Sequence, residues 1–230
     1  MNHGFWPMMG WVIASSILGF AISAVFAGWL KFSRSRFLIP YVSLITIFLY
    51  SFAISSEIDV STFLITNLIW GILAGGLVSI FLVKTVRAQP LSRQSSGVFL
   101  LFDITWAGLV YGLIDALFLN VMPVAAVWFG ASHFGWSTTA MGGIAVAVMG
   151  LFASLLVTLT YHLGYPEFRN NRVGMVLAGN SIITLAFLLS GSPLGSIISH
   201  TAMHVAAVLQ GAETTIQLPP HYQNQAVDTR

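Results

Sequence analysis

Apolar runs of about 20 residues, separated by short polar turns, occupy almost all of this 230-residue chain. Hydrophobic residues make up 57% of it and charged residues 7%, against about 25% charged residues in an ordinary soluble domain. A helix of about 20 apolar residues crosses a hydrocarbon core of about 30 Å, and lipid offers no hydrogen bonds to an open backbone. The sequence therefore predicts an all-α fold, a polytopic transmembrane helical bundle of about seven or eight helices. One such domain is expected over residues 1–211, followed by a short polar tail at 212–230.

One of the apolar runs does not fit this pattern. Residues 121–134 are too few for a full span and are interrupted by Pro123 and Gly130, so they form either a short buried or re-entrant segment or a further crossing. The first run has no basic segment before it and no small-residue cleavage site after it, so we expect a retained helix. The predicted spans are, in chain order, 8–30, 37–55, 63–83, 97–119, 138–163, 173–189 and 194–210.

The basic residues lie in short loops between the apolar runs. Loops 31–36 and 84–93 carry most of them, which is the charge pattern of cytoplasmic loops. We therefore expect these two loops in the cytoplasm, the N-terminus outside, and the protein in the inner or plasma membrane. If the loop around Asn170 is also cytoplasmic, segment 121–134 does not cross fully. The net charge of +2 is explained by these loops, so a nucleic-acid partner is not expected.

The sharpest chemical feature is a pair of histidines within an apolar run. His200 and His204 are four residues apart, so on a helix they share one face with their Cβ atoms about 5–6 Å apart. Two such imidazoles can hold one zinc ion or another divalent transition metal, provided that another helix supplies a third ligand. Alternatively, both histidines are neutral, bond to backbone carbonyls or to hydroxyls such as those of Ser196 and Ser199, and only pack helices together.

Other ionisable side chains in the apolar runs are candidates for the same site, because such groups are costly in lipid. His133 could be the third metal ligand, or else an interfacial histidine in an aromatic belt. Asp103 and Asp115 are the candidate catalytic bases; they are separated by about 120° around one helix, and each could instead bond to a neighbouring helix. His162 flanks a predicted membrane boundary, where solvation explains it. Cysteine is absent, which excludes thiolate ligands and disulfides.

The second half of the chain, roughly residues 103–209, resembles the CPBP family of intramembrane metalloproteases, the CAAX-protease and bacteriocin-processing (Abi) group. Phe129-Gly130-Ala131-Ser132-His133 is similar to that family's Phe-x-x-x-His motif. The stretch from His200 to His204 is similar to its third motif, with His204 where asparagine is usual. The family's Glu-Glu-x-x-x-Arg motif is missing, since residues 106–111 read Trp-Ala-Gly-Leu-Val-Tyr. Because those glutamates activate water in the family, the resemblance implies a divergent or proteolytically inactive member.

Three functions remain open from the sequence. The first is an intramembrane metal-dependent hydrolase, in which His133, His200 and His204 hold the metal and Asp103 or Asp115 replaces the lost glutamate. The second is a non-catalytic membrane scaffold or a subunit of a larger complex, and the third is a transporter or proton relay. The expected partners are membrane lipids, a membrane-embedded peptide or lipid-like ligand, and partner subunits or further copies of the chain.

Overall fold

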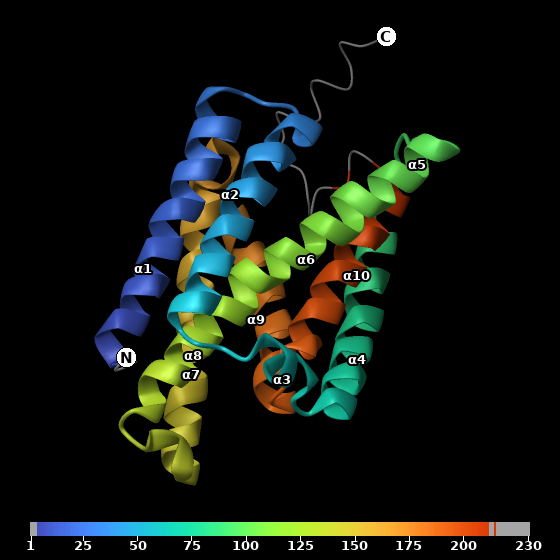
Figure 1. Ribbon diagram of the computed structural model, residues 1–230. Coiled ribbons are helices and arrows are strands. Elements are labelled where there is room, and N and C mark those ends of the chain that lie inside the picture. The colour runs from blue at the N-terminus through green and yellow to red at the C-terminus, as the bar shows by residue number, and fades with distance from the viewer. Residues whose placement is uncertain (1–3, 212–213, 215–230) are drawn as a thin grey trace.

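The computed structural model describes residues 4–211 and Thr214, and within that part of the chain it is all-α, without a strand (Figure 1). The predicted transmembrane helical bundle is thereby confirmed, although the predicted tail at 212–230 lies outside the described residues apart from Thr214. Six helical spans are long and apolar enough to cross a membrane: Phe5–Trp29, Arg34–Ser55, Leu68–Arg87, Val98–Ser132, Ala140–Leu163 and Arg172–Ser190. The helices are α1 (Phe5–Ile22, extended by a π-helical turn, Ser23–Trp29), α2 (Arg34–Ser55), α3 (Val60–Ile65), α4 (Leu68–Arg87), α5 (Val98–Asp103), α6 (Tyr111–Ala116), α7 (Met122–Ser132), α8 (Ala140–Leu163), α9 (Arg172–Ser190) and α10 (Leu194–Gln210).

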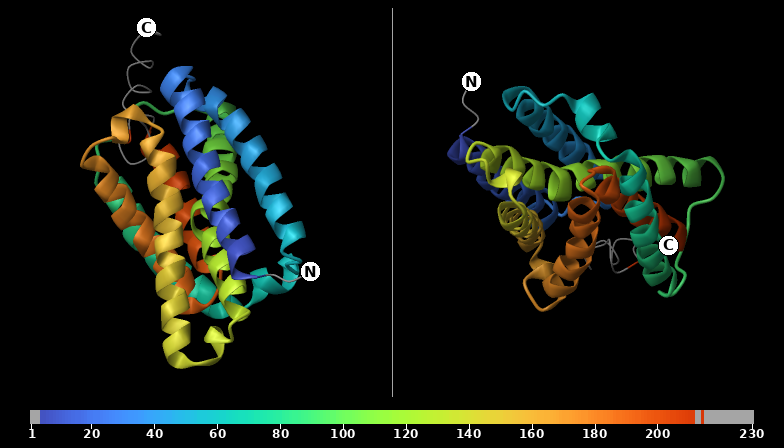
Figure 2. Two further views of the ribbon diagram at one scale, coloured as in Figure 1. Left: turned by 90° about the vertical axis from the view of Figure 1, so that its left-hand side faces the viewer. Right: turned by 90° about the horizontal axis from the view of Figure 1, so that it is seen from below.

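The most unusual element is a single helix of 35 residues, Val98–Ser132, which we call the long helix. It consists of α5, α6 and α7 joined by the π-helical turns Ile104–Val110 and Leu117–Val121. At 1.5 Å per residue it is about 52 Å long, well beyond a hydrocarbon core of about 30 Å. It therefore runs obliquely, and Figure 2 (right) shows it crossing the bundle with α2 on one side and α9 and α10 on the other.

The long helix corrects the prediction for residues 121–134, which are neither a separate crossing nor a re-entrant segment. Residues 121–132 form the last part of the long helix, and residues 133–134 lie in the turn that follows it. Pro123 does not end it, because the preceding π-helical turn Leu117–Val121 already departs from the regular α-helical hydrogen-bond pattern. The chain thus accommodates Pro123 by a local change from α-helix to π-helix, and the helix continues.

Glycines allow α10 to approach the long helix closely. A Cβ atom at Gly112 would lie 3.0 Å from both the Cβ of His204 and the Cα of Thr201, and one at Gly108 would lie 3.1 Å from the side chain of Val205. Small residues at such crossings bring helix backbones together in lipid, where burial of apolar surface contributes little to association. This contact fixes the distance between the histidines of α10 and the middle of the long helix.

The loops at the two ends of the bundle differ in charge. The α1–α2, α4–α5 and α8–α9 connections lie at one end, which we call the basic end (Figures 1 and 2). At the opposite end, Asp59 begins α3 by accepting hydrogen bonds from the amides of Ser61 and Thr62, and the hydrogen bonds from these two residues lower the pKa of Asp59 to about 2. In or beside the connections of the basic end are all the lysines and arginines of the described residues: Lys31, Arg34, Arg36, Lys84, Arg87, Arg93, Arg169 and Arg172.

Gly195→Ala is expected to destabilise the packing of α10 against α9. A Cβ atom at Gly195 would lie 2.4 Å from the backbone oxygen of Ala186, so the two helices must move apart. Overpacking of this kind costs about 1–3 kcal/mol, which thermal unfolding in detergent will show as a lower midpoint. Gly76→Ala on α4 is the control, because nothing lies within 4 Å of its added methyl group. Equal midpoints for the two variants would contradict this packing.

Candidate metal centre

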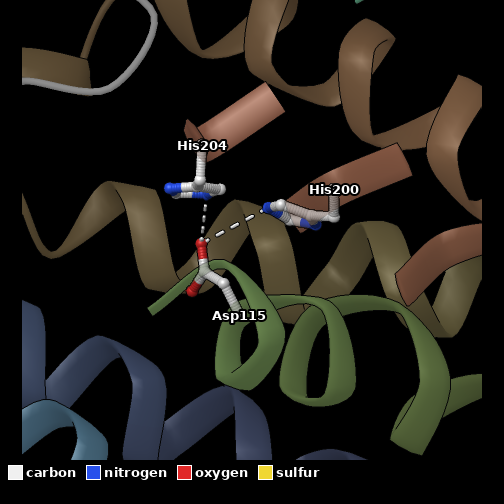
Figure 3. Close-up of side chains that lie close together, drawn as sticks. All are labelled: Asp115, His200 and His204. Carbon is white, nitrogen blue, oxygen red and sulfur yellow. Dashed lines mark ion pairs between the residues drawn. The ribbon is translucent and has the colours of Figure 1, made fainter. Parts of the chain in front are cut away.

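A carboxylate and two imidazoles meet inside the bundle (Figure 3). Asp115 lies near the middle of the long helix, and His200 and His204 face it from successive turns of α10. The Oδ2 atom of Asp115 is 3.5 Å from Nε2 of His200 and 3.5 Å from Nε2 of His204. The two rings are nearly parallel, at 19°, with centroids 5.0 Å apart. All three residues are at most 4% exposed, so bulk water has little access to them.

Three potential ligand atoms lie close enough together that they could hold one ion. One potential ligand atom from each of the three residues lies within 4.8 Å of the others. In a tetrahedral zinc site with bonds of about 2.1 Å, neighbouring ligand atoms are about 3.4 Å apart. Two imidazole nitrogens and a carboxylate oxygen are also a ligand set that zinc uses in proteins. The two 3.5 Å separations from Asp115 and the types of ligand are therefore compatible with one metal ion.

The proton on His200 is placed by its neighbour Asn120. The amide nitrogen of Asn120 donates to Asn180 Oδ1 and to Thr184 Oγ1, both at 2.8 Å, so its oxygen is the atom left to accept. That oxygen lies 2.8 Å from Nδ1 of His200, which must then carry the proton. In a neutral imidazole protonated at Nδ1, the lone pair is on Nε2 and points to Asp115.

The Asn120 side chain belongs to a polar network that links three helices. Asn180 of α9 donates to Ser154 Oγ of α8 at 3.0 Å, and Ser154 donates to the backbone oxygen of Leu119 at 2.6 Å. Asn120, Ser154 and Thr184 are fully buried and Asn180 is 5% exposed. A buried network with its polar atoms paired is rigid, because each lost bond would leave an unsatisfied group. It therefore holds the ring of His200 in one orientation.

The second oxygen of Asp115 is held separately. Its Oδ1 accepts a hydrogen bond from the hydroxyl of Tyr41 on α2, which is fully buried. The ring of Tyr111 lies edge-on to that of His204, with centroids 4.7 Å apart. Only Oδ2 thus faces the histidines, and the carboxylate has little freedom to rotate away from them.

The facing atoms of Asp115 and His200 are suited to share a cation. A carboxylate oxygen and an unprotonated Nε2 are both acceptors, so 3.5 Å between them is unfavourable unless a proton or a metal ion is shared. Burial makes the requirement stricter, because an unpaired carboxylate is costly away from water. The three residues could therefore share a proton or hold a metal ion.

The structure does not bring the other sequence candidates to this group. His133 is exposed at the C-terminal end of α7, against Phe134. Asp103 is partly exposed in the first part of the long helix and accepts a hydrogen bond of 2.6 Å from Ser95. His162 bonds through Nδ1 to the backbone oxygen of Thr158 at 2.8 Å. The sequence analysis expected Asp115 as a catalytic base and His133 as the third ligand. In the structure it is Asp115, and not His133, that lies beside His200 and His204.

The two hydroxyls named as alternative partners of the histidines donate hydrogen bonds elsewhere. The hydroxyl of Ser196 donates to the backbone oxygen of Ile183, and that of Ser199 to the backbone oxygen of Gly195. Sequence reasoning missed Asn120, Asn180 and Tyr41 as parts of the site. Asn180 could have been found, because it is an amide within an apolar run of α9, whereas Tyr41 resembles any other aromatic residue of the bundle.

The apolar spans and this buried group define a multi-pass helical membrane protein with a candidate intramembrane metal centre. Comparisons with models of protein families, with curated proteins and with solved structures gave no match. The chemistry of the site is therefore argued from its own residues.

Proposed function

We propose that this protein is an intramembrane metal-dependent hydrolase in which Asp115, His200 and His204 hold one zinc-like ion. The observation that carries the proposal is the pair of 3.5 Å separations between Asp115 Oδ2 and the two Nε2 atoms, one of which has its lone pair directed at the carboxylate. Three protein ligands leave a fourth position for water, as in catalytic zinc sites. When bound, the metal would lower the pKa of that water toward about 7.

The surrounding residues have separate roles in this proposal. Asn120 keeps the proton of His200 on Nδ1, so that Nε2 can bind. Tyr41 holds Oδ1 of Asp115, so that Oδ2 stays directed at the histidines. Asp115 is then a ligand and not the general base expected from the sequence. Because the group is buried, the hydrolysis would use a water held at the open position of the metal and not bulk solvent.

Metal analysis of the purified protein tests the proposal. Wild-type protein, prepared without chelators, is expected to contain about one transition-metal ion per chain, and His204→Ala is expected to lose it. His133→Ala is the matched control, because this exposed histidine lies outside the group, and it is expected to retain the metal. Wild-type protein without stoichiometric metal would overturn the proposal, and loss of metal in His133→Ala would contradict the assigned ligands.

A second measurement separates a catalytic from a structural metal. Cobalt-substituted protein is expected to change its visible spectrum when azide is added, because azide replaces the water at the open position. A spectrum that azide leaves unchanged would mean a closed site. That result would contradict the hydrolase while leaving the metal centre in place.

A proton relay is the second candidate function, and a specific observation favours it. The cation shared by Asp115 and the histidines could be a proton, and buried tyrosine hydroxyls extend toward the basic end. Tyr111 and Tyr161 are joined at 3.1 Å, and Tyr161 and Tyr165 at 2.9 Å. Intramembrane carboxylates and histidines serve proton transfer in transporters. The metal analysis decides between the two functions, since a relay needs no stoichiometric metal.

The proposal shares with the CPBP family only the reaction type, a metal-dependent hydrolysis within the membrane. The hydrolase proposed here uses Asp115 as a ligand where the sequence resemblance implied His133. The family's paired glutamates are missing. We therefore propose a hydrolase with its own ligand set, and not a peptidase that uses that family's catalytic residues.

The basic end is proposed to face the cytoplasm, in line with the positive-inside rule. Because the long helix crosses once, the loop around Asn170 falls on the same side as loops 31–36 and 84–93. A reporter enzyme fused at Asn170 is expected to be active in the cytoplasm, and one fused at Gly135 on the opposite side. A cytoplasmic reporter at Gly135 or an external one at Asn170 would contradict this topology.

A further inference from the structure

A groove lies on the surface of the bundle, between α4, α10 and the first half of the long helix. Its volume is about 610 Å³, within the about 300–1,000 Å³ typical of small-molecule sites. Apart from Thr201 and Arg87, all residues that line it are apolar. They are Val83 from α4, Leu109 and Leu113 from the long helix, and several residues of α10 between Ile197 and Leu209.

The groove is distinct from the metal centre. None of Asp115, His200 and His204 lines it. The close contact of Gly112 with Thr201 and His204 lies between the two, so α10 presents its histidines to one side and the groove to the other. A ligand in the groove and a metal at the centre can therefore be studied separately.

We propose that this groove binds one acyl chain of an anionic phospholipid, with the headgroup phosphate at Arg87. Arg87 is the last residue of α4, is exposed, and lies at the basic end of the bundle. A guanidinium group there pairs well with a phosphate at the membrane surface. Arg87 thus gives the groove a polar entrance, and the apolar walls continue from it into the bilayer.

The length of the groove matches the length of an acyl chain in one leaflet. Along α10, the lining runs over 13 positions from Leu209 to Ile197, and the 12 steps between them span about 18 Å at 1.5 Å per residue. One leaflet contributes about 15 Å, half of a hydrocarbon core of about 30 Å. A chain anchored at Arg87 therefore reaches the inner end of the groove near the middle of the bilayer.

Native mass spectrometry of delipidated protein in detergent, with equal amounts of phosphatidylglycerol and phosphatidylcholine, tests the proposal. Wild-type protein is expected to retain phosphatidylglycerol in preference to phosphatidylcholine. In Arg87→Gln this preference is expected to fall about fivefold, the effect of one basic side chain at an anionic headgroup. Lys84→Gln is the matched control: it removes a cation from the same turn region of α4, but Lys84 does not line the groove, so the preference is expected to persist.

A second pair of variants tests the apolar part. Ala202→Trp fills the groove and is expected to lower bound phosphatidylglycerol, whereas Ala145→Trp on the outer face of α8 is expected to leave it unchanged. Equal lipid retention in these two variants, or an unchanged preference in Arg87→Gln, would overturn the proposal. It would also be overturned by a dimer that binds no lipid and dissociates in Ala202→Trp, since a second copy of the chain would then occupy the groove.

Discussion

Asp115→Asn is expected to weaken zinc binding by more than the about 10–100-fold that follows loss of a hydrogen-bond partner of a ligand. The substitution keeps the size of the side chain but replaces the anionic oxygen that faces both histidines at 3.5 Å with a neutral amide. A buried site then holds a divalent cation without a compensating negative charge. The measurement is competition between the purified protein and a zinc-binding fluorescent indicator.

Asp103→Asn is the control for this substitution, because it removes the other aspartate of the long helix. Asp103 bonds to Ser95 and is partly exposed, outside the candidate centre. Its zinc affinity is expected to equal that of the wild type. Equal losses in the two variants would mean that Asp115 acts through the general charge of the helix and not as a ligand.

Asn120→Leu is expected to have the second largest effect, a loss of about 10–100-fold in zinc affinity. Without the amide oxygen, Nδ1 of His200 has no acceptor, and the imidazole loses its fixed tautomer and orientation. The unfolding midpoint is also expected to fall, because the amide of Asn180 and the hydroxyl of Thr184 each lose a buried partner.

Asn180→Leu separates these two effects. It removes a buried amide from the same network, but the side chain of Asn180 hydrogen-bonds to Asn120 and Ser154 and not to His200. We expect a similar fall in the unfolding midpoint and a smaller loss of zinc affinity than in Asn120→Leu. If both variants lose affinity in proportion to stability, Asn120 has only a structural role.

The fold could be predicted largely from the sequence, because lipid leaves a chain few choices. The run at 194–210 matches α10, Leu194–Gln210, and the run at 173–189 lies within α9, Arg172–Ser190. The prediction that the helix ends before the polar Asn120, with Pro123 interrupting the next run, is wrong, because the long helix continues through both residues. The π-helical turn before that proline depends on packing around it and has no clear signal in the local sequence.

The candidate site could be predicted only in part. The pair His200 and His204 follows from the period of a helix, so its common face was foreseen. The third member depends on which helix packs against α10, which spacing along the chain cannot specify. His133 was favoured by its resemblance to a motif, whereas Asp115 is brought to the histidines by the close approach of α10 at Gly112.

X-ray absorption spectroscopy of the zinc-loaded wild-type protein tests the central claim most directly, because it detects the ligands of the ion themselves. The account predicts a zinc ion with nitrogen and oxygen ligands at about 2.0–2.1 Å and the outer-sphere scattering of two imidazole rings. Both rings are expected to disappear from the spectrum of any metal that the double variant His200→Ala, His204→Ala still binds. A wild-type spectrum without imidazole scattering, or with only one ring, would contradict the centre formed by Asp115, His200 and His204.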